Sequence, residues 1–132
     1  MLKLLWGKDI ENTNILTTID NVNSLVDSNF KGTLKCEAKT LFSTGGSYEF
    51  IKIMQHIYNE GTIYIKRDFT HCAIKIEDDL YDFKGKLINI NDYLEANDAH
   101  IYILDKYLNP YYKLFNISNT IIRLLDKKQY QM

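Results

Sequence analysis

The chain has 132 residues, the size of one domain, and we expect a single domain over residues 1–132. Hydrophobic residues make up 45% of it and charged residues 25%, which is ordinary for a globular protein. The formal net charge of −1 excludes a global electrostatic attraction to nucleic acid or to an anionic membrane. No apolar run approaches the roughly 18 residues of a membrane-spanning helix. We therefore expect neither nucleic acid nor a membrane as a partner.

The first residues do not predict a signal peptide, because the short apolar start Met1–Trp6 is soon followed by Lys8, Asp9 and Glu11. The protein is thus expected in the cytoplasm, or secreted as an effector without a conventional signal peptide. Its 2 cysteines fit free thiols in a reducing compartment better than a disulfide framework. No CxxC or clustered Cys/His pattern predicts a zinc site, and we expect no metal and no organic cofactor.

Apolar residues at helical spacing predict a helix in the first third of the chain. Its apolar stripe consists of Ile19, Val22, Leu25, Val26 and Phe30. Thr18 or Asp20 would cap its start, and Gly32 would close its end. The pattern over residues 34–42 is ambiguous, and we interpret it as a short helix.

A second helix is predicted by a wider apolar stripe. The stripe consists of Phe50, Ile51, Met54, Ile57 and Tyr58. Ser47 would be its N-cap, and Glu49 would favour the positive end of the helix dipole. Gly45-Gly46 lets the chain turn tightly into this helix, and Glu60-Gly61 ends it.

Strand signals follow the second helix. Thr62–Lys66 and His71–Ile76 both alternate between apolar and polar residues, as half-buried strands do. Asp78-Asp79 marks a turn, and Leu80–Phe83 reads as the partner strand of a hairpin.

The last third carries shorter signals. Asn91 would cap a short helix that runs to Glu95, and the run Ala99–Leu104 is typical of a further strand. Ser118 or Asn119 would cap a final helix. Helices, then a small antiparallel sheet, then helices again indicate the α+β class.

Three residues in the middle of the chain fit the parts of a nucleophilic site. Ser47 at a helix start would benefit from the unpaired N–H groups there, which can also bind an oxyanion. His71 would take the proton of the nucleophile, and Asp82 would fix the tautomer of His71. A turn at Asp78-Asp79 pairs Lys75 with Asp82, which puts Asp82 on the His71 face but about two positions too far away. A bulge or a tighter register would bring it into reach, and simple pairing of Asp82 with Lys75 is the competing interpretation.

The stretch from Gly45 to Gly85 resembles the papain-like superfamily of cysteine peptidases and amidases, in the broad sense that includes NlpC/P60- and transglutaminase-like proteins. Gly-Gly-Ser47-Tyr-Glu-Phe is similar to the segment in which the cysteine opens a helix behind a glycine-rich loop. His71-Cys-Ala-Ile-Lys-Ile and Leu-Tyr-Asp82-Phe-Lys-Gly are similar to the histidine strand and the strand of the polar third residue. The resemblance implies a papain-like core arrangement and the hydrolysis of an amide bond.

The departure from this pattern is Ser47, which stands where the family has its cysteine. A serine hydroxyl is a far weaker nucleophile than a thiolate at neutral pH. Three explanations stay open: an engineered cysteine-to-serine change, a pseudoenzyme that keeps the cleft as a binding site, and a true serine nucleophile. Whether the protein is an enzyme is therefore open from the sequence.

Each candidate also has a plain structural interpretation. Ser47 alone would be a helix cap, and His71 a partly buried strand histidine with one hydrogen bond. Cys72 alternates to the side of Ile74 and Ile76, which predicts a core position.

Other reactive and aromatic residues have weaker patterns. Cys36, beside Lys35, is a rival nucleophile, although no glycine loop precedes it. His56 lies away from the apolar stripe and is expected in solvent, and His100 is expected to be structural. Core or boundary packing is expected for a group of aromatic residues that could also line a partner surface. They are Tyr102, Tyr107, Tyr111, Tyr112 and Phe115.

Two functions from different classes follow. The first is a cysteine-hydrolase-like protein (peptidase, amidase or deamidase) that acts on a peptide, peptidoglycan or protein substrate through Ser47, His71 and Asp82. The second is a non-catalytic interaction protein, such as a phage or mobile-element inhibitor or a pseudoenzyme, that binds a protein partner. The abundance of Ile, Asn, Lys and Tyr is typical of AT-rich bacterial or phage genomes. A local basic patch of Lys84, Lys86 and Lys113 is the only feature that favours nucleic acid.

Overall fold

A computed structural model describes residues 15–34, 37–43, 46–106 and 117–130. Its helices are α3 (Ile15–Leu34), α4 (Ala38–Ser43), α5 (Ser47–Ile57), α6 (Asp98–Lys106) and α8 (Ile117–Tyr130). Its strands are β1 (Thr62–Lys66), β2 (Cys72–Ile76), β3 (Asp79–Asp82), β4 (Gly85–Lys86) and β5 (Tyr93–Glu95). Helices and an antiparallel sheet confirm the α+β class.

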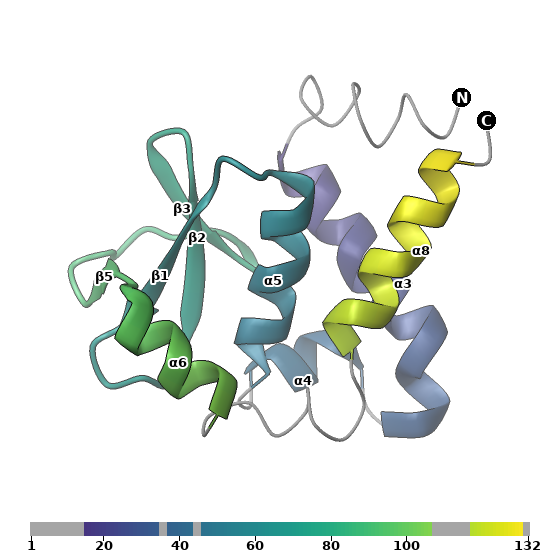
Figure 1. Ribbon diagram of the computed structural model, residues 1–132, viewed down its shortest axis with the longest axis horizontal. Coiled ribbons are helices and arrows are strands. Elements are labelled where there is room, and N and C mark those ends of the chain that lie inside the picture. Colours follow the sequence, from purple (N-terminus) through teal and green to yellow (C-terminus); the bar gives the residue numbers. More distant parts are fainter. Residues whose placement is uncertain (1–14, 35–36, 44–45, 107–116, 131–132) are drawn as a thin grey trace.

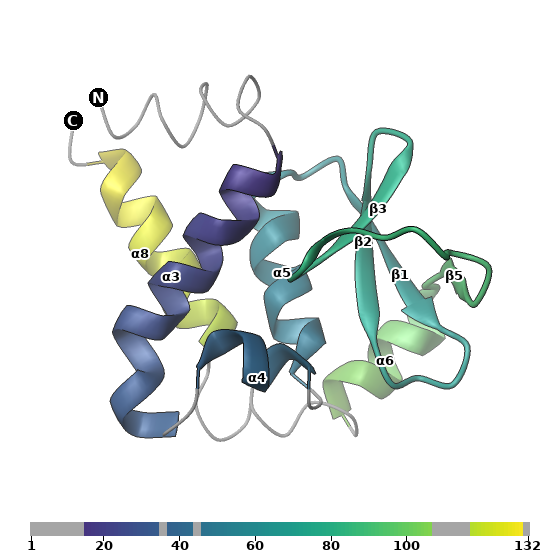
Figure 2. The ribbon, with the colours of Figure 1, turned by 180° about the vertical axis from the view of Figure 1, so that it is seen from behind.

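Helix α5 forms the centre of the fold. It lies between the sheet on one side and the helices α3 and α8 on the other, as Figures 1 and 2 show from opposite sides. A helix in this place must be apolar around most of its circumference. Five of its hydrophobic side chains and one glutamate are buried: Tyr48, Phe50, Ile51, Ile53, Met54 and Glu49. Its first residue, Ser47, comes directly after the α4–α5 connection.

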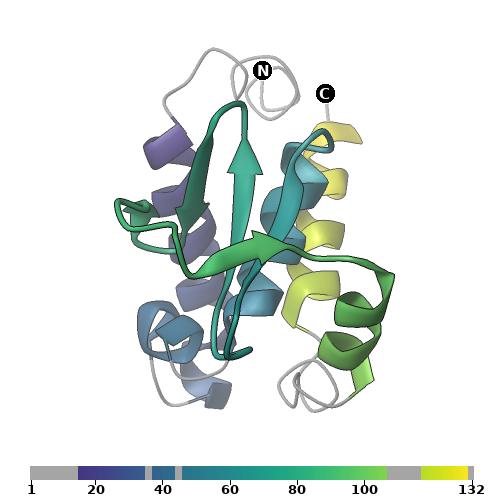
Figure 3. The ribbon, with the colours of Figure 1, turned by 90° about the vertical axis from the view of Figure 1, so that its left-hand side faces the viewer.

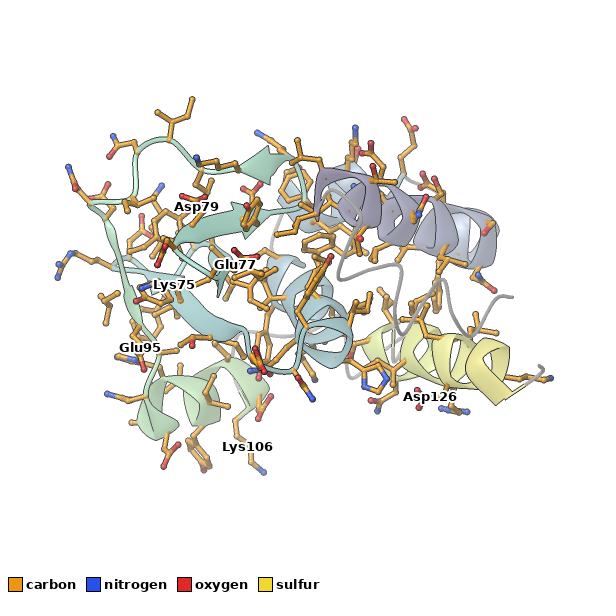
Figure 4. All side chains as sticks on the ribbon, turned by 90° about the horizontal axis from the view of Figure 1, so that it is seen from above. Lys75, Glu77, Asp79, Glu95, Lys106 and Asp126 are labelled. Atoms are coloured by element: carbon orange, nitrogen blue, oxygen red, sulfur yellow. The ribbon has the colours of Figure 1, made fainter. Side chains whose placement is uncertain are left out.

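The sheet has the strand order β4-β3-β2-β1-β5, and all its pairs are antiparallel. Cys72, Ile74 and Ile76 of β2 belong to the core cluster together with the α5 side chains. Because side chains alternate along a strand, His71, Ala73 and Lys75 belong to the opposite face, which we call the outer face. Figure 4 places Lys75 and Glu95 on this side of the sheet, away from α5.

The chain between β4 and β5 crosses the outer face of the sheet. Figure 3 looks onto that face and shows β5, at the end of this segment, crossing in front of β2. Its two ends are tied down, because Leu87 N–H donates to Leu80 O and Arg67 N–H donates to Asp92 O, each over 2.8 Å. Ala73, on the same face, is fully buried.

Two predicted elements in the last third are wrong. Ala99–Leu104 lies in helix α6 rather than in a strand. The helix begins at Asp98 because Asn97 and His100 cap it reciprocally: His100 N–H donates to Asn97 Oδ1 and Asn97 N–H donates to His100 Nδ1. The short helix predicted from Asn91 to Glu95 is strand β5, which forms because it pairs with the edge of β1.

Several predicted helix ends are also wrong. Thr18 and Asp20 lie inside α3, and Gly32 does not end it, because the helix continues to Leu34. Ser118 and Asn119 lie inside the first turn of α8, which begins at Ile117. The short helix expected near residues 34–42 is confirmed as α4.

Candidate functional site

His71 and Asp82 form a close pair on the outer side of the sheet. His71 Nε2 lies 2.9 Å from Asp82 Oδ2, and the exposed fractions of the two side chains are 18% and 7%. The second carboxylate oxygen, Asp82 Oδ1, accepts the backbone N–H of Lys84 over 2.8 Å. The His71 ring also meets the Phe83 ring edge-on, with 5.8 Å between centroids. Asp82 is thus fixed by the backbone, and it fixes the imidazole in turn.

The register of the β2–β3 hairpin explains this contact. Ile76 pairs with Asp79, so the turn is formed by Glu77 and Asp78 instead of Asp78-Asp79, and Glu77 adopts a positive φ of 59°. Lys75 therefore opposes Leu80, and the predicted pairing of Lys75 with Asp82 is wrong. Because Ile74 pairs with Tyr81, the next pair along the hairpin is Ala73 and Asp82. Asp82 is therefore the diagonal neighbour of His71.

Ser47 contacts the strand of His71 through the backbone. Its Oγ accepts the N–H of Cys72 over 3.0 Å, and the residue is 4% exposed. Ser47 is the first residue of α5 rather than its N-cap, which is Gly46, and its side chain makes no capping bond. Two bonds, of about 1.33 and 1.52 Å, connect Cys72 N to His71 Cα. Added to the 3.0 Å hydrogen bond, they place Ser47 Oγ no more than about 6 Å from that Cα.

The three predicted site residues are therefore brought together unequally. His71 and Asp82 are hydrogen-bonded. Ser47 is adjacent to them, but within the described part of the chain its hydroxyl makes no hydrogen bond to the His71 ring. The hydroxyl also contacts the Cys72 thiol. Burial raises the pKa of that thiol to about 12, while the hydrogen bond from Ser47 acts in the opposite direction.

The start of α5 is held from a second side by Tyr48. Burial first, and then the charge and hydrogen bond of Asp105, raise the pKa of the Tyr48 phenol well above its ordinary value of 10.0. Lys52 lies over the same ring, 5.1 Å from its centroid. Tyr48 thus joins the start of α5 to the end of α6 and restrains the backbone of its neighbour Ser47.

Comparison with known families matches residues 22–125 to the family described as Phage YunG-like protein. The chain belongs to this family. The match spans Ser47, His71 and Asp82. No curated protein and no solved structure matches the chain.

The remaining predicted residues of this Phage YunG-like chain have varied surroundings. Cys72 is 2% exposed, which confirms its core position. His56 is not simply solvated, because its Nε2 lies 2.8 Å from Asp126 Oδ1 on α8, which Figure 4 labels. His100 has the expected structural role, as part of the α6 cap. Others lie outside the described residues: Cys36, Tyr107, Tyr111, Tyr112, Lys113 and Phe115.

Lys84 and Lys86, two members of the basic patch considered from the sequence, each contact a different neighbouring side chain. Lys84 lies over the Phe83 ring, 5.6 Å from its centroid, and Lys86 forms an ion pair with Asp79 at 3.5 Å. Among the described helices, none has the length and apolar content needed to cross a membrane. The described residues also hold no group of three or more His, Cys, Asp or Glu side chains suited to a metal ion.

Sequence reasoning about this Phage YunG-like chain missed two residues near the site. Tyr93 was assigned to a helix, although the alternation of Tyr93, Leu94 and Glu95 after a turn is a weak strand signal. Glu49 was assigned to the dipole of its own helix, but its carboxylate reaches another helix. The sequence carries no signal for that contact, because it depends on how α5 and α8 pack.

Proposed function

We propose that the protein carries an acyl-transfer site for amide bonds, of the cysteine-hydrolase type. His71 is the general base, Asp82 orients it, and Ser47 occupies the position of the nucleophile. The substrate is an amide: a peptide bond, a peptidoglycan crosslink or a glutamine side chain. The resemblance of residues 45–85 to papain-like peptidases and amidases supports this proposal, and the chemistry needs no metal and no organic cofactor.

The observation that carries the proposal is the contact between His71 and Asp82. Because Nε2 is held by the carboxylate, Nδ1 is the ring nitrogen left to take a proton from a nucleophile. A buried carboxylate beside an imidazole stabilises the imidazolium that forms when the proton is taken. The Lys84 N–H holds Asp82 in place, as an orienting group requires.

The position of Ser47 supports the nucleophile assignment. It opens α5, where the first N–H groups have no partner inside the helix and where the dipole favours negative charge. The same N–H groups can stabilise the oxyanion of a tetrahedral intermediate. To act on His71, the Ser47 hydroxyl would have to leave the Cys72 N–H that it now binds.

The test is alkylation of a Ser47→Cys variant by iodoacetamide as a function of pH, with the site of labelling located by mass spectrometry. Cys36→Ser removes one background thiol, and the raised pKa of Cys72 suppresses the other. We expect the introduced thiol to be labelled well below the ordinary thiol pKa of about 8.5, with the advantage lost when His71→Ala is added. Adding Asp82→Asn instead should remove at least part of it. If the introduced thiol has an ordinary pKa, and this pKa does not change when His71→Ala is added, the proposal is refuted.

A second candidate function is favoured by the contact of Ser47. Its hydroxyl is buried and already accepts a backbone N–H, as in a residue that joins a helix to a strand. On this interpretation the protein is a non-catalytic member of its family that binds a protein partner, in the cytoplasm or as a secreted effector. An unactivated thiol at position 47, together with a wild-type Ser47 that does not react with a fluorophosphonate, would favour this alternative.

A further inference from the structure

Asn23 on α3 reaches the turn that follows Asp82. Its Nδ2 donates to the backbone oxygen of Phe83 over 3.0 Å, although 60 residues separate the two in the chain. The exposed fractions of the two residues are 4% and 2%. The bond thus joins α3, from inside the protein, to the hairpin that carries Asp82.

The side-chain amide of Asn23 is only half satisfied. Within the described residues, its buried Oδ1 has no hydrogen-bond partner, and such a group is costly. Its neighbours on the same face of the helix, Ile19 and Val26, are buried and apolar. An apolar residue would pack there without this cost. The bond to the Phe83 oxygen is therefore the property of Asn23 that an apolar residue could not replace.

The Phe83–Lys84 peptide links Asn23 to Asp82. Asn23 holds the oxygen of this peptide, and the Lys84 N–H donates to Asp82 Oδ1 over 2.8 Å. Because the peptide unit is planar and trans, its C=O and N–H point in opposite directions. Asp82 Oδ2 in turn accepts from His71 Nε2, 2.9 Å away, since a carboxylate can only accept. A continuous line of hydrogen bonds therefore runs from Asn23 through one peptide and one carboxylate to the imidazole.

The peptide that Asn23 holds is the central one of a tight turn. Asp82 pairs with Gly85, so only two residues form this turn. Turn types I and II differ mainly in the orientation of their central peptide. A bond to the oxygen of that peptide favours the orientation in which the N–H faces Asp82. It also polarises the peptide, which makes the N–H a stronger donor.

We propose that Asn23 is a positioning residue for the pair of His71 and Asp82. It keeps the turn peptide oriented toward one carboxylate oxygen, which leaves the other oxygen for His71 Nε2. The Phe83 ring meets the His71 ring edge-on, with 5.8 Å between centroids, so holding the Phe83 backbone restrains the imidazole from a second side. The value of this alignment for catalysis rests on the proposed function, whereas the alignment itself does not.

The experiment compares proton exchange with water in the wild type and in Asn23→Leu, by NMR of the ¹⁵N-labelled full chain. Leucine has nearly the shape of asparagine but carries no donor. We expect the Lys84 amide and the His71 Nε2 proton to exchange about fivefold faster, which corresponds to about one ordinary hydrogen bond. Both rates are taken relative to the Ala96 amide, which donates to Ile63 O at the far edge of the sheet.

The matched control is Thr18→Val, which nearly keeps the shape of the side chain. It removes another hydrogen bond of a buried α3 residue, whose partner is the Tyr58 hydroxyl, 3.1 Å away. Because this bond joins α3 to the end of α5 rather than to the turn after Asp82, neither relative rate should change. Asn23→Ala also lacks the donor and adds no bulk, so it carries the same prediction if Asn23→Leu does not fold.

The outcomes separate this inference from the proposed function. Unchanged exchange in Asn23→Leu, or equal changes in Thr18→Val, would overturn the inference. Faster exchange of the Lys84 amide alone would also overturn it, because Asn23 would then stabilise the turn without positioning His71.

Alkylation of the Ser47→Cys variant adds a second measurement. Adding Asn23→Leu should reduce its labelling advantage, as Asp82→Asn does. If Ser47→Cys is not activated at all, the proposed function fails, while faster exchange at His71 in Asn23→Leu still supports the positioning role. Activated labelling, combined with unchanged exchange in Asn23→Leu, would retain the proposed function and remove Asn23 from it.

Discussion

The carboxylate of Glu49 on α5 accepts the backbone N–H of Ser118 on α8, over 2.8 Å between Oε1 and N. Glu49 is fully buried, and its other oxygen, Oε2, lies 3.7 Å from Lys52 Nζ. The first N–H groups of a helix have no partner within it, and the helix dipole favours a negative charge at that end. One buried side chain thus fixes the start of α8 against the helix that begins with Ser47.

Glu49→Ala is expected to lower the free energy of unfolding by about 2–4 kcal/mol, because it leaves the Ser118 N–H buried without an acceptor. Glu49→Gln keeps an acceptor and should cost less. Urea unfolding followed by circular dichroism measures both values. The control is Glu37→Ala, which removes an exposed glutamate and should change the free energy by no more than about 0.5 kcal/mol. Equal stabilities of Glu49→Ala and Glu37→Ala would contradict the capping assignment.

Gly46 is required by a close approach between α4 and α5. A Cβ at this position would lie 2.8 Å from Leu41 O and 3.0 Å from Leu41 Cγ. The Gly46 N–H donates to the same Leu41 O over 3.0 Å, so the backbone has little room to move. Gly46→Ala should therefore cost about 1–3 kcal/mol of unfolding free energy, measured by urea denaturation. Ser43→Ala, at an exposed end of α4, is the control, and a similar small effect of both changes would argue against this clash.

The sequence was most informative where one periodicity extends over many residues. The stripe from Phe50 to Tyr58 predicted α5, and the alternation in Thr62–Lys66 and His71–Ile76 predicted β1 and most of β2. Strand β5 has only three residues, so its alternation is a weak local signal, and the strand forms because β1 offers an edge. Helix α6 looked like a strand because its apolar run is continuous, although only Leu104 is buried among its residues.

The candidate site was predictable in its residue types but not in its contacts. The alternation of side chains along the two strands placed His71 and Asp82 on one face of the sheet. Their distance depended on whether the turn begins at Glu77 or at Asp78, and the polar run Glu77-Asp78-Asp79 does not decide between these registers. The bond of Ser47 to the Cys72 N–H depends on how α5 packs on β2, so local sequence carries no signal for it.

The charge of Asp82 should be detectable at Tyr93. Because burial, and then that charge, raise the Tyr93 pKa to about 12, Tyr93 should keep its proton at about pH 11, where exposed tyrosines are largely ionised. Asp82→Asn removes the charge and leaves the burial. The pKa should then fall but stay above its ordinary value of 10.0.

NMR of protein labelled with ¹³C at tyrosine Cζ reads each phenol separately. Asp78→Asn, in the exposed β2–β3 turn, is the control for losing one negative charge, and it should leave Tyr93 unchanged. If both variants shift Tyr93 equally, or neither does, Asp82 and Tyr93 do not share a local environment.

Cys72 should make the fold sensitive to alkali. Burial raises the pKa of its thiol from an ordinary value of 9.0 to about 12, so the folded state favours the neutral form. Between these two values the folded protein keeps a proton that the unfolded chain has lost. The contribution to stability is therefore complete below about pH 9 and declines by about 1.4 kcal/mol per pH unit above it.

Cys72→Ala removes this titration. Its stability near pH 7 should be lower because the buried sulfur atom is lost, but its decline from about pH 9 to about pH 10 should be shallower than that of the wild type. Urea unfolding at several pH values in this range measures the two slopes, and the comparison is of slopes because the packing loss is independent of pH. The range ends at about pH 10, since the raised pKa values of Tyr48 and Tyr93 add their own declines above it. Parallel slopes would mean that the Cys72 thiol titrates alike in the folded and unfolded chains, in conflict with its burial between α5 and β2.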